Sequence, residues 1–156
     1  MFRLALPVLA TLAAAVIGGL GSVRSGELYA QLAKPRWAPP ASVFGPMWTV
    51  LYLLMAVAAM LVVRRAGWAG ARPAMILFGI QLALNALWPW LFFGWRQGTA
   101  SAVEIVGLMI VLVLTVLAFA RVHRGAAALL LPYLVWIGYA TALTWSVWRR
   151  NPGLLG

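Results

Sequence analysis

Residues 101–120 read SAVEIVGLMIVLVLTVLAFA, an apolar run interrupted by one charged side chain, Glu104. A helix of about 20 residues, rising 1.5 Å per residue, spans the roughly 30 Å hydrocarbon core of a bilayer. Four further apolar runs of similar length cover residues 4–20, 43–63, 73–93 and 126–148. The sequence therefore predicts an all-α membrane protein, a bundle of five transmembrane helices forming a single domain over residues 1–156.

The composition supports the same class. Of the 156 residues, 65% are hydrophobic and 9% are charged, whereas a soluble domain carries about 25% charged residues. The formal net charge is +10, but the basic residues fall in small groups between the apolar runs, where lipid headgroups would meet them. We therefore expect a lipid bilayer, and no nucleic acid, to be the partner of these charges.

The distribution of basic residues does not set the orientation of the chain in the membrane. With five spans, Lys and Arg residues are divided equally between the two sides, so the excess of positive charge that marks a cytoplasmic side is missing. The first run, residues 4–20, is long for a signal-peptide core and no clear cleavage site follows it, so we expect this helix to be retained.

The link between the first two helices, residues 21–42, is much longer than the other three. It contains Tyr29, Trp37 and three prolines, Pro35, Pro39 and Pro40. The prolines favour an extended path after one or two helical turns within residues 27–33. Because long connections are usually functional or disordered, the two aromatic residues favour a packed loop acting as a lid. The alternative is a segment lying among the headgroups.

The third helix has two distinct faces. Gln81, Asn85 and Trp88 lie on one face at helical spacing, and polar side chains inside a membrane are expected to face the bundle interior. Either they form hydrogen bonds between helices or they contact a ligand. The opposite face carries Gly79, Ala83 and Ala86, small residues that favour close helix approach, within the chain or across a homodimer.

Tryptophan is abundant, with nine residues. Trp48, Trp88 and Trp136 lie within or near the ends of spans, where interfacial anchoring explains them less well than it explains Trp68, Trp95 and Trp148. Together with Asn85 they are typical of an aromatic small-molecule pocket with few polar groups. On the fifth helix, Trp136 and Ala140 are four residues apart and would form a recess for a flat ring, unless a neighbouring side chain fills it.

Catalytic groups are scarce. Cysteine is absent, and the acidic residues are Glu27 and Glu104. We expect Glu104 to pair with an arginine, either Arg96 or a C-terminal arginine, and the single histidine, His123, to be an exposed loop residue. No catalytic residue, metal site or required cofactor is expected, and an enzymatic activity is not the favoured interpretation.

Three segments carry a resemblance to a known family. They are residues 28–55, LYAQLAKPRWAPPASVFGPMWTVLYLLM; residues 81–94, QLALNALWPWLFFG; and residues 132–151, PYLVWIGYATALTWSVWRRN. These segments resemble the translocator protein / tryptophan-rich sensory protein family (TspO/MBR, the peripheral-type benzodiazepine receptor), over almost the whole chain.

The resemblance implies a cavity capped by the first loop that binds hydrophobic ligands, among them porphyrins and haem, sterols, and synthetic isoquinoline or benzodiazepine compounds. It also implies the ligand-binding residues. They are Tyr29, Trp37 and Pro40 in the loop, Trp48 and Tyr52 on the second helix, Asn85 and Trp88 on the third, and Trp136 and Ala140 on the fifth.

The chain departs from the family pattern at two positions. Leu28 precedes Tyr29, where many relatives have Trp, and Trp145 stands where the sterol-recognition pattern of animal members has Tyr. The second departure favours a porphyrin-type ligand over a sterol. The short tail and compact loops favour a bacterial cell membrane.

Three hypotheses for the function follow. The favoured one is a membrane binding or transport protein for tetrapyrroles (porphyrin, haem) and similar hydrophobic ligands, with a sensory or stress-regulatory role. The first alternative is light- and oxygen-dependent degradation of porphyrin, with Trp48 and Trp136 as redox-active indoles. The second is a partner-regulating membrane protein without an essential ligand.

Overall fold

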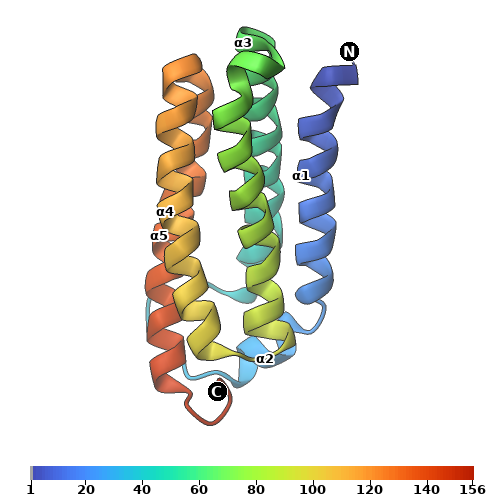
Figure 1. Ribbon diagram of the computed structural model, residues 1–156. Helices are drawn as coiled ribbons and strands as arrows, with labels where there is room; N and C mark the ends of the chain where they lie inside the picture. Colours follow the sequence, from blue (N-terminus) through green and yellow to red (C-terminus); the bar gives the residue numbers. More distant parts are fainter. Residues whose placement is uncertain (1) are drawn as a thin grey trace.

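The computed structural model describes residues 2–156, apart from the side chain of Phe2, and is helical almost throughout. Its elements are α1 (Phe2–Gly21), α2 (Ser25–Gln31), the 3-10 helix η1 (Ala41–Val43), α3 (Phe44–Pro89), the π-helix η2 (Trp90–Gly94), α4 (Gly98–Val122) and α5 (Arg124–Arg150). Figure 1 shows α1 on one side of a bundle, α4 and α5 on the other, and α3 between them. The expected all-α bundle is confirmed, since the described residues contain no strand.

The long helix α3 is a hairpin. Gly67 has φ 68° and ψ 169°, outside the helical region, a backbone conformation that glycine adopts readily and other residues avoid. Asn85 contacts Tyr52 and Gln81 contacts Met55, so the two halves run antiparallel. Four helical stretches are long and apolar enough to cross a membrane: Arg3–Gly21, Ala41–Gly94, Gly98–Val122 and Arg124–Arg150. The second of these is the hairpin, so the described residues form five long helical rods, which run side by side in Figure 1.

The helices continue past the ends predicted from the apolar runs. The first half of α3 passes the predicted end at Val63 and includes Arg64 and Arg65. Arginine does not end a helix at a membrane surface, because its apolar stem lies along lipid while its head reaches the interface. The nine-residue turn expected over residues 64–72 is therefore reduced to a kink at Gly67.

Two further helix ends have local causes. After Pro89 the chain forms η2, in which Trp95 N–H donates to the Trp90 carbonyl at 2.7 Å, the spacing of a π-helical turn. Between α4 and α5, His123 Nδ1 accepts a hydrogen bond from the Ala126 N–H at 3.0 Å. His123 lies in the link as expected, but the expectation that it is exposed is wrong, because its ring is half-buried and caps α5.

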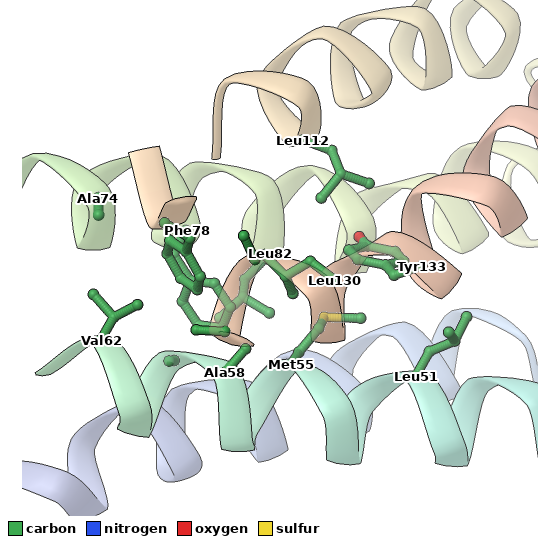
Figure 2. Close-up of a cluster of buried hydrophobic side chains, with 14 of the residues drawn as sticks. Leu51, Met55, Ala58, Val62, Ala74, Phe78, Leu82, Leu112, Leu130 and Tyr133 are labelled. Carbon is green, nitrogen blue, oxygen red and sulfur yellow. The ribbon is translucent and has the colours of Figure 1, made fainter. Parts of the chain in front are cut away.

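The core lies between the two halves of α3 and the helices α4 and α5. Leu51, Met55, Ala58 and Val62 come from the first half, Ala74, Phe78 and Leu82 from the second, Leu112 from α4, and Leu130 and Tyr133 from α5 (Figure 2). The Phe78 ring stacks on Phe119 of α4 with centroids 5.8 Å apart. This core fixes the helices that surround the site.

Helix α1 packs closely on α3 through small residues. A Cβ atom at Gly18 would lie 3.6 Å from the Ala86 Cα, and one at Gly21 would lie 2.8 Å from Trp90 Cδ1. Ala86 is therefore buried against α1, whereas Gly79 and Ala83 are exposed. Of the three small residues predicted to mediate close helix contact, Ala86 makes that contact within the chain, and a homodimer through Gly79 and Ala83 stays a prediction.

Candidate functional site

A cavity of about 350 Å³ lies in the half of the bundle that carries α2 and the C-terminus. All four long helices and α2 contribute to its wall. Seven of the nine residues that the resemblance implied line it: Tyr29, Trp48, Tyr52, Asn85, Trp88, Trp136 and Ala140. Its size falls in the range of small-molecule sites, about 300–1,000 Å³.

Aromatic rings form the wall between α3 and α5. The Trp48 and Trp136 rings are nearly perpendicular, at 89° with centroids 6.4 Å apart. Trp48 also contacts Tyr52 at 5.8 Å, and Phe44 contacts Trp136 at 5.9 Å. The Trp48–Trp136 and Phe44–Trp136 pairs are edge-to-face, a favourable arrangement, so these rings hold one another in position around the cavity.

The two membrane-buried amides have different surroundings. Asn85 lines the cavity, and its Nδ2 donates to the Tyr52 hydroxyl at 3.2 Å. Gln81 lies deeper, fully buried, and its Oε1 accepts from the Tyr133 hydroxyl at 2.8 Å. Gln81 therefore connects α3 and α5 away from the cavity, which is the interhelical alternative for that residue.

The first link contributes to one end of the cavity wall. Helix α2 brings the Tyr29 ring to the wall, and the Tyr29 hydroxyl donates to the Pro39 carbonyl. Lys34 Nζ donates to the Tyr29 carbonyl at 2.6 Å and lies 4.6 Å from the Tyr29 ring centre. Burial, and secondarily Tyr139, raises the pKa of the Tyr29 phenol, so this hydroxyl remains a hydrogen-bond donor at neutral pH.

Trp37 and Pro40 belong to the same link but do not line the cavity. The Trp37 ring packs on Tyr139 with centroids 5.6 Å apart and is 48% exposed, and its carbonyl accepts from the Tyr139 hydroxyl. Pro40 is exposed and precedes η1. The two residues therefore lie in the loop outside the cavity wall, where Trp37 ties the loop to α5.

The C-terminal tail holds the loop from outside, a contact that the sequence analysis missed. Ala33 N–H donates to Asn151 Oδ1 at 2.8 Å, and Asn151 Nδ2 donates back to the Ala33 carbonyl at 2.9 Å. Leu155 is 1% exposed and joins a second apolar cluster with Leu28 and Leu32 of the loop. The tail thus fixes the segment that carries Tyr29.

Small residues of α1 and α2 form another part of the wall and were also missed. The cavity is lined there by Ala15, Gly18, Gly19, Ser22, Ser25 and Gly26. Among the lining residues, Gly19, Gly26, Ala41 and Gly45 are exposed, so the cavity opens between the end of α1, α2 and the start of α3. Glycine and alanine do not identify a cavity wall by their side chains. The run of Gly and Ala in α1 is the one feature of the sequence that hints at free space beside this helix.

Glu104 lies on α4 and does not line the cavity. The prediction that it pairs with an arginine is wrong: both carboxylate oxygens are buried, and no described residue donates a hydrogen bond to them. Arg96 is in the link before α4, where its carbonyl accepts from Gly156 N–H. Among residues 2–156, no three His, Asp or Glu side chains gather as metal ligands would.

Comparison with known proteins identifies the family. The model of the TspO/MBR family matches residues 7–149. The chain belongs to the TspO/MBR family.

The TspO/MBR relatives come from all three domains of life. The tryptophan-rich protein TspO of Chlorobaculum tepidum is 43% identical over 126 residues, covering 80% of this chain and 79% of that protein. That of Archaeoglobus fulgidus is 36% identical over 152 residues, covering 97% and 98%. The human translocator protein is 40% identical over 131 residues, covering 82% and 77%. The resemblance predicted from three segments is therefore confirmed.

Proposed function

We propose that this TspO/MBR protein crosses a bacterial cell membrane with its five rods and binds tetrapyrroles, such as porphyrin or haem, in the cavity under the first loop. The observation that carries the proposal is the cavity itself, whose wall holds Trp48 and Trp136 as perpendicular indoles beside Asn85. Aromatic walls of this kind stack on flat conjugated rings. Relatives are named translocator protein and tryptophan-rich sensory protein, and a transport or sensory role for the bound ligand is part of the proposal.

The opening of the cavity suits a ligand with acidic substituents. It lies beside the turn after α1 that carries Arg24, which is exposed. Lys34 is already engaged by the Tyr29 carbonyl, so Arg24 and the exposed Arg36 are the cations left in this link to attract propionates. A macrocycle bound in the cavity would place its substituted edge at this opening, beside these cations.

Tryptophan fluorescence tests the proposal. We expect protoporphyrin IX to quench the emission of the purified protein saturably, because several indoles would stack on or lie beside the ring. The Arg24→Ala variant should bind protoporphyrin IX several-fold more weakly but leave its dimethyl ester unaffected, since the ester has no charge to attract. Quenching that rises in proportion to the protoporphyrin IX concentration without saturating would disprove specific binding.

Illumination in air separates binding from degradation. The absorption spectrum of the bound porphyrin should stay the same in the dark and in light if the protein only binds or moves its ligand. A new absorption band that forms in light and is lost in the Trp48→Phe and Trp136→Phe variants would instead favour the degrading activity.

A further inference from the structure

Three indole N–H groups of the protein donate to backbone carbonyls on a neighbouring helix. Trp68 donates to the Arg3 carbonyl at 3.1 Å, Trp90 to the Ile17 carbonyl at 2.8 Å, and Trp145 to the Ala102 carbonyl at 3.1 Å. Each of these bonds joins two different helices. Indole is a donor only, so a backbone carbonyl on a neighbouring helix is the natural partner within a bilayer that supplies no water.

Two indoles break this pattern, and both line the cavity. The Nε1 atoms of Trp88 and Trp136 are buried and have no hydrogen-bond acceptor within the described part of the chain. Trp136 is 8% exposed in total. A buried donor left unpaired costs about 1–3 kcal/mol, and more than 90% of buried backbone groups and most buried side-chain polar groups in native proteins are paired. Two unpaired donors at the same cavity therefore indicate partners that arrive with the ligand.

Two other polar groups of the cavity wall already donate hydrogen bonds within the protein. Asn85, which the sequence analysis expected to bond a ligand, donates to Tyr52, and Tyr29 donates to Pro39. Glu104 also has unpaired buried oxygens, but it does not line the cavity. Among the described residues, the buried polar atoms of the cavity wall that lack a partner are thus two indole N–H donors, which require acceptors on a ligand.

We propose that the ligand is a planar conjugated ring compound with carbonyl oxygens on its edge, which accept hydrogen bonds from Trp88 and Trp136. The proposal rests on the proposed function, because it narrows the ligand class of the same cavity. The imine nitrogens of a porphyrin point to the centre of the macrocycle and cannot reach an indole at its edge. Within tetrapyrroles, the cavity therefore selects rings whose edge carries oxygen over rings whose edge carries only alkyl groups.

Menadione and 2-methylnaphthalene are matched probes for this requirement. They share the fused ring and the methyl group and differ by the two carbonyl oxygens. Binding is measured for both in the same detergent, from the rise in unfolding temperature with probe concentration. In Trp88→Phe and Trp136→Phe, the affinity for menadione should fall about three- to tenfold, the effect of one lost hydrogen bond. The affinity for 2-methylnaphthalene should change less than twofold.

The Trp145→Phe variant is the matched control. Its indole is bonded to Ala102 and does not line the cavity, so both probes should bind as in the unaltered protein. A second measurement needs no variant: the carbonyl stretching band of menadione should move to lower wavenumber when it binds the unaltered protein, as it does on accepting a hydrogen bond.

The outcomes separate this inference from the proposed function. If both probes raise the unfolding temperature and lose affinity equally in Trp88→Phe and Trp136→Phe, or if the carbonyl band does not move, the indoles only pack and the inference is wrong. If protoporphyrin IX raises the unfolding temperature and neither probe does, the inference that the ligand must carry edge carbonyl oxygens is wrong, but the proposed function stands. If none of the three does, the cavity is not a ligand site and both fail.

Discussion

Replacing Asn151 with alanine is expected to loosen the loop over the cavity and to lower the free energy of unfolding by about 2–4 kcal/mol. The Asn151 side chain makes hydrogen bonds to Ala33 N–H, to the Ala33 carbonyl and to the Val147 carbonyl, at 2.8, 2.9 and 2.7 Å. It is 7% exposed, and alanine would remove all three bonds at once, two of them to the backbone of Ala33. Hydrogen exchange at the Ala33 amide should become at least tenfold faster.

Arg150→Ala is the neighbouring control. Arg150 is exposed, and its Nε–H donates only to Ser146 within its own helix, at 3.2 Å, an interaction worth little at a surface. The unfolding temperature of Arg150→Ala and the rate of hydrogen exchange at its Ala33 amide should match those of the unaltered protein. If Asn151→Ala also matched the unaltered protein in both measurements, Asn151 would not be the residue that holds the loop.

The second large effect is expected at the buried pair formed by Tyr133 and Gln81. Both side chains are 0% exposed, and the phenol donates to Gln81 Oε1 at 2.8 Å. Tyr133→Phe leaves the amide oxygen unpaired, and Gln81→Leu leaves the phenol unpaired, so each should cost about 1–3 kcal/mol. The double variant should cost clearly less than the sum, because it removes both polar groups together. Unfolding of the four proteins in one detergent measures this coupling.

Tyr139→Phe is the control for the Tyr133 and Gln81 variants. Tyr139 is on the same helix, but it is only half-buried and its hydroxyl donates to the Trp37 carbonyl near the surface, where water can replace it. We expect its loss to cost less than the loss of the Tyr133 hydroxyl. Additive effects of Tyr133→Phe and Gln81→Leu would show that the pair is not coupled and that Gln81 has another role.

The sequence predicts the bundle well because bilayer thickness imposes a length on each apolar run. It predicts helix ends less well, since Arg64 and Arg65 look like boundaries although arginine is compatible with a helix that emerges from lipid. The position of the reversal depends on one residue, Gly67, whose positive φ no hydrophobicity pattern reveals.

For the site, the large aromatic residues are the part that can be predicted. Trp48, Trp88 and Trp136 stood out because interfacial anchoring did not explain them, and all three line the cavity. The contribution of α1 could not be predicted, because Gly18 and Gly19 act through the space they leave. The bond between Asn151 and Ala33 joins positions 118 residues apart and uses a backbone group, so the sequence carries no pairing signal for it.

The hydrogen bonds around the cavity determine which of its residues are free to bond a ligand. In the sequence, Asn85 is the obvious group for a ligand, because amides are rare in membrane helices. In the structure Asn85 donates to Tyr52, whereas the indoles chosen for their flat rings, Trp88 and Trp136, keep unpaired N–H groups. The hydrogen bonds of the folded protein therefore move the expected polar contact from the amide to the indoles.

The central claim is that a planar ligand occupies the cavity between Trp48, Asn85 and Trp136, and a cavity-filling variant tests it most directly. Ala140 lines the cavity, whereas Ala142 on the same helix is exposed and does not, so Ala140→Phe and Ala142→Phe form a matched pair. The measurement is the unfolding temperature of each protein at increasing concentrations of protoporphyrin IX. A ligand at about 100 times its Kd should stabilise the unaltered protein and Ala142→Phe by about 2.7 kcal/mol and leave Ala140→Phe unchanged. An equal rise in all three proteins would contradict the account, because the porphyrin would then be bound somewhere else.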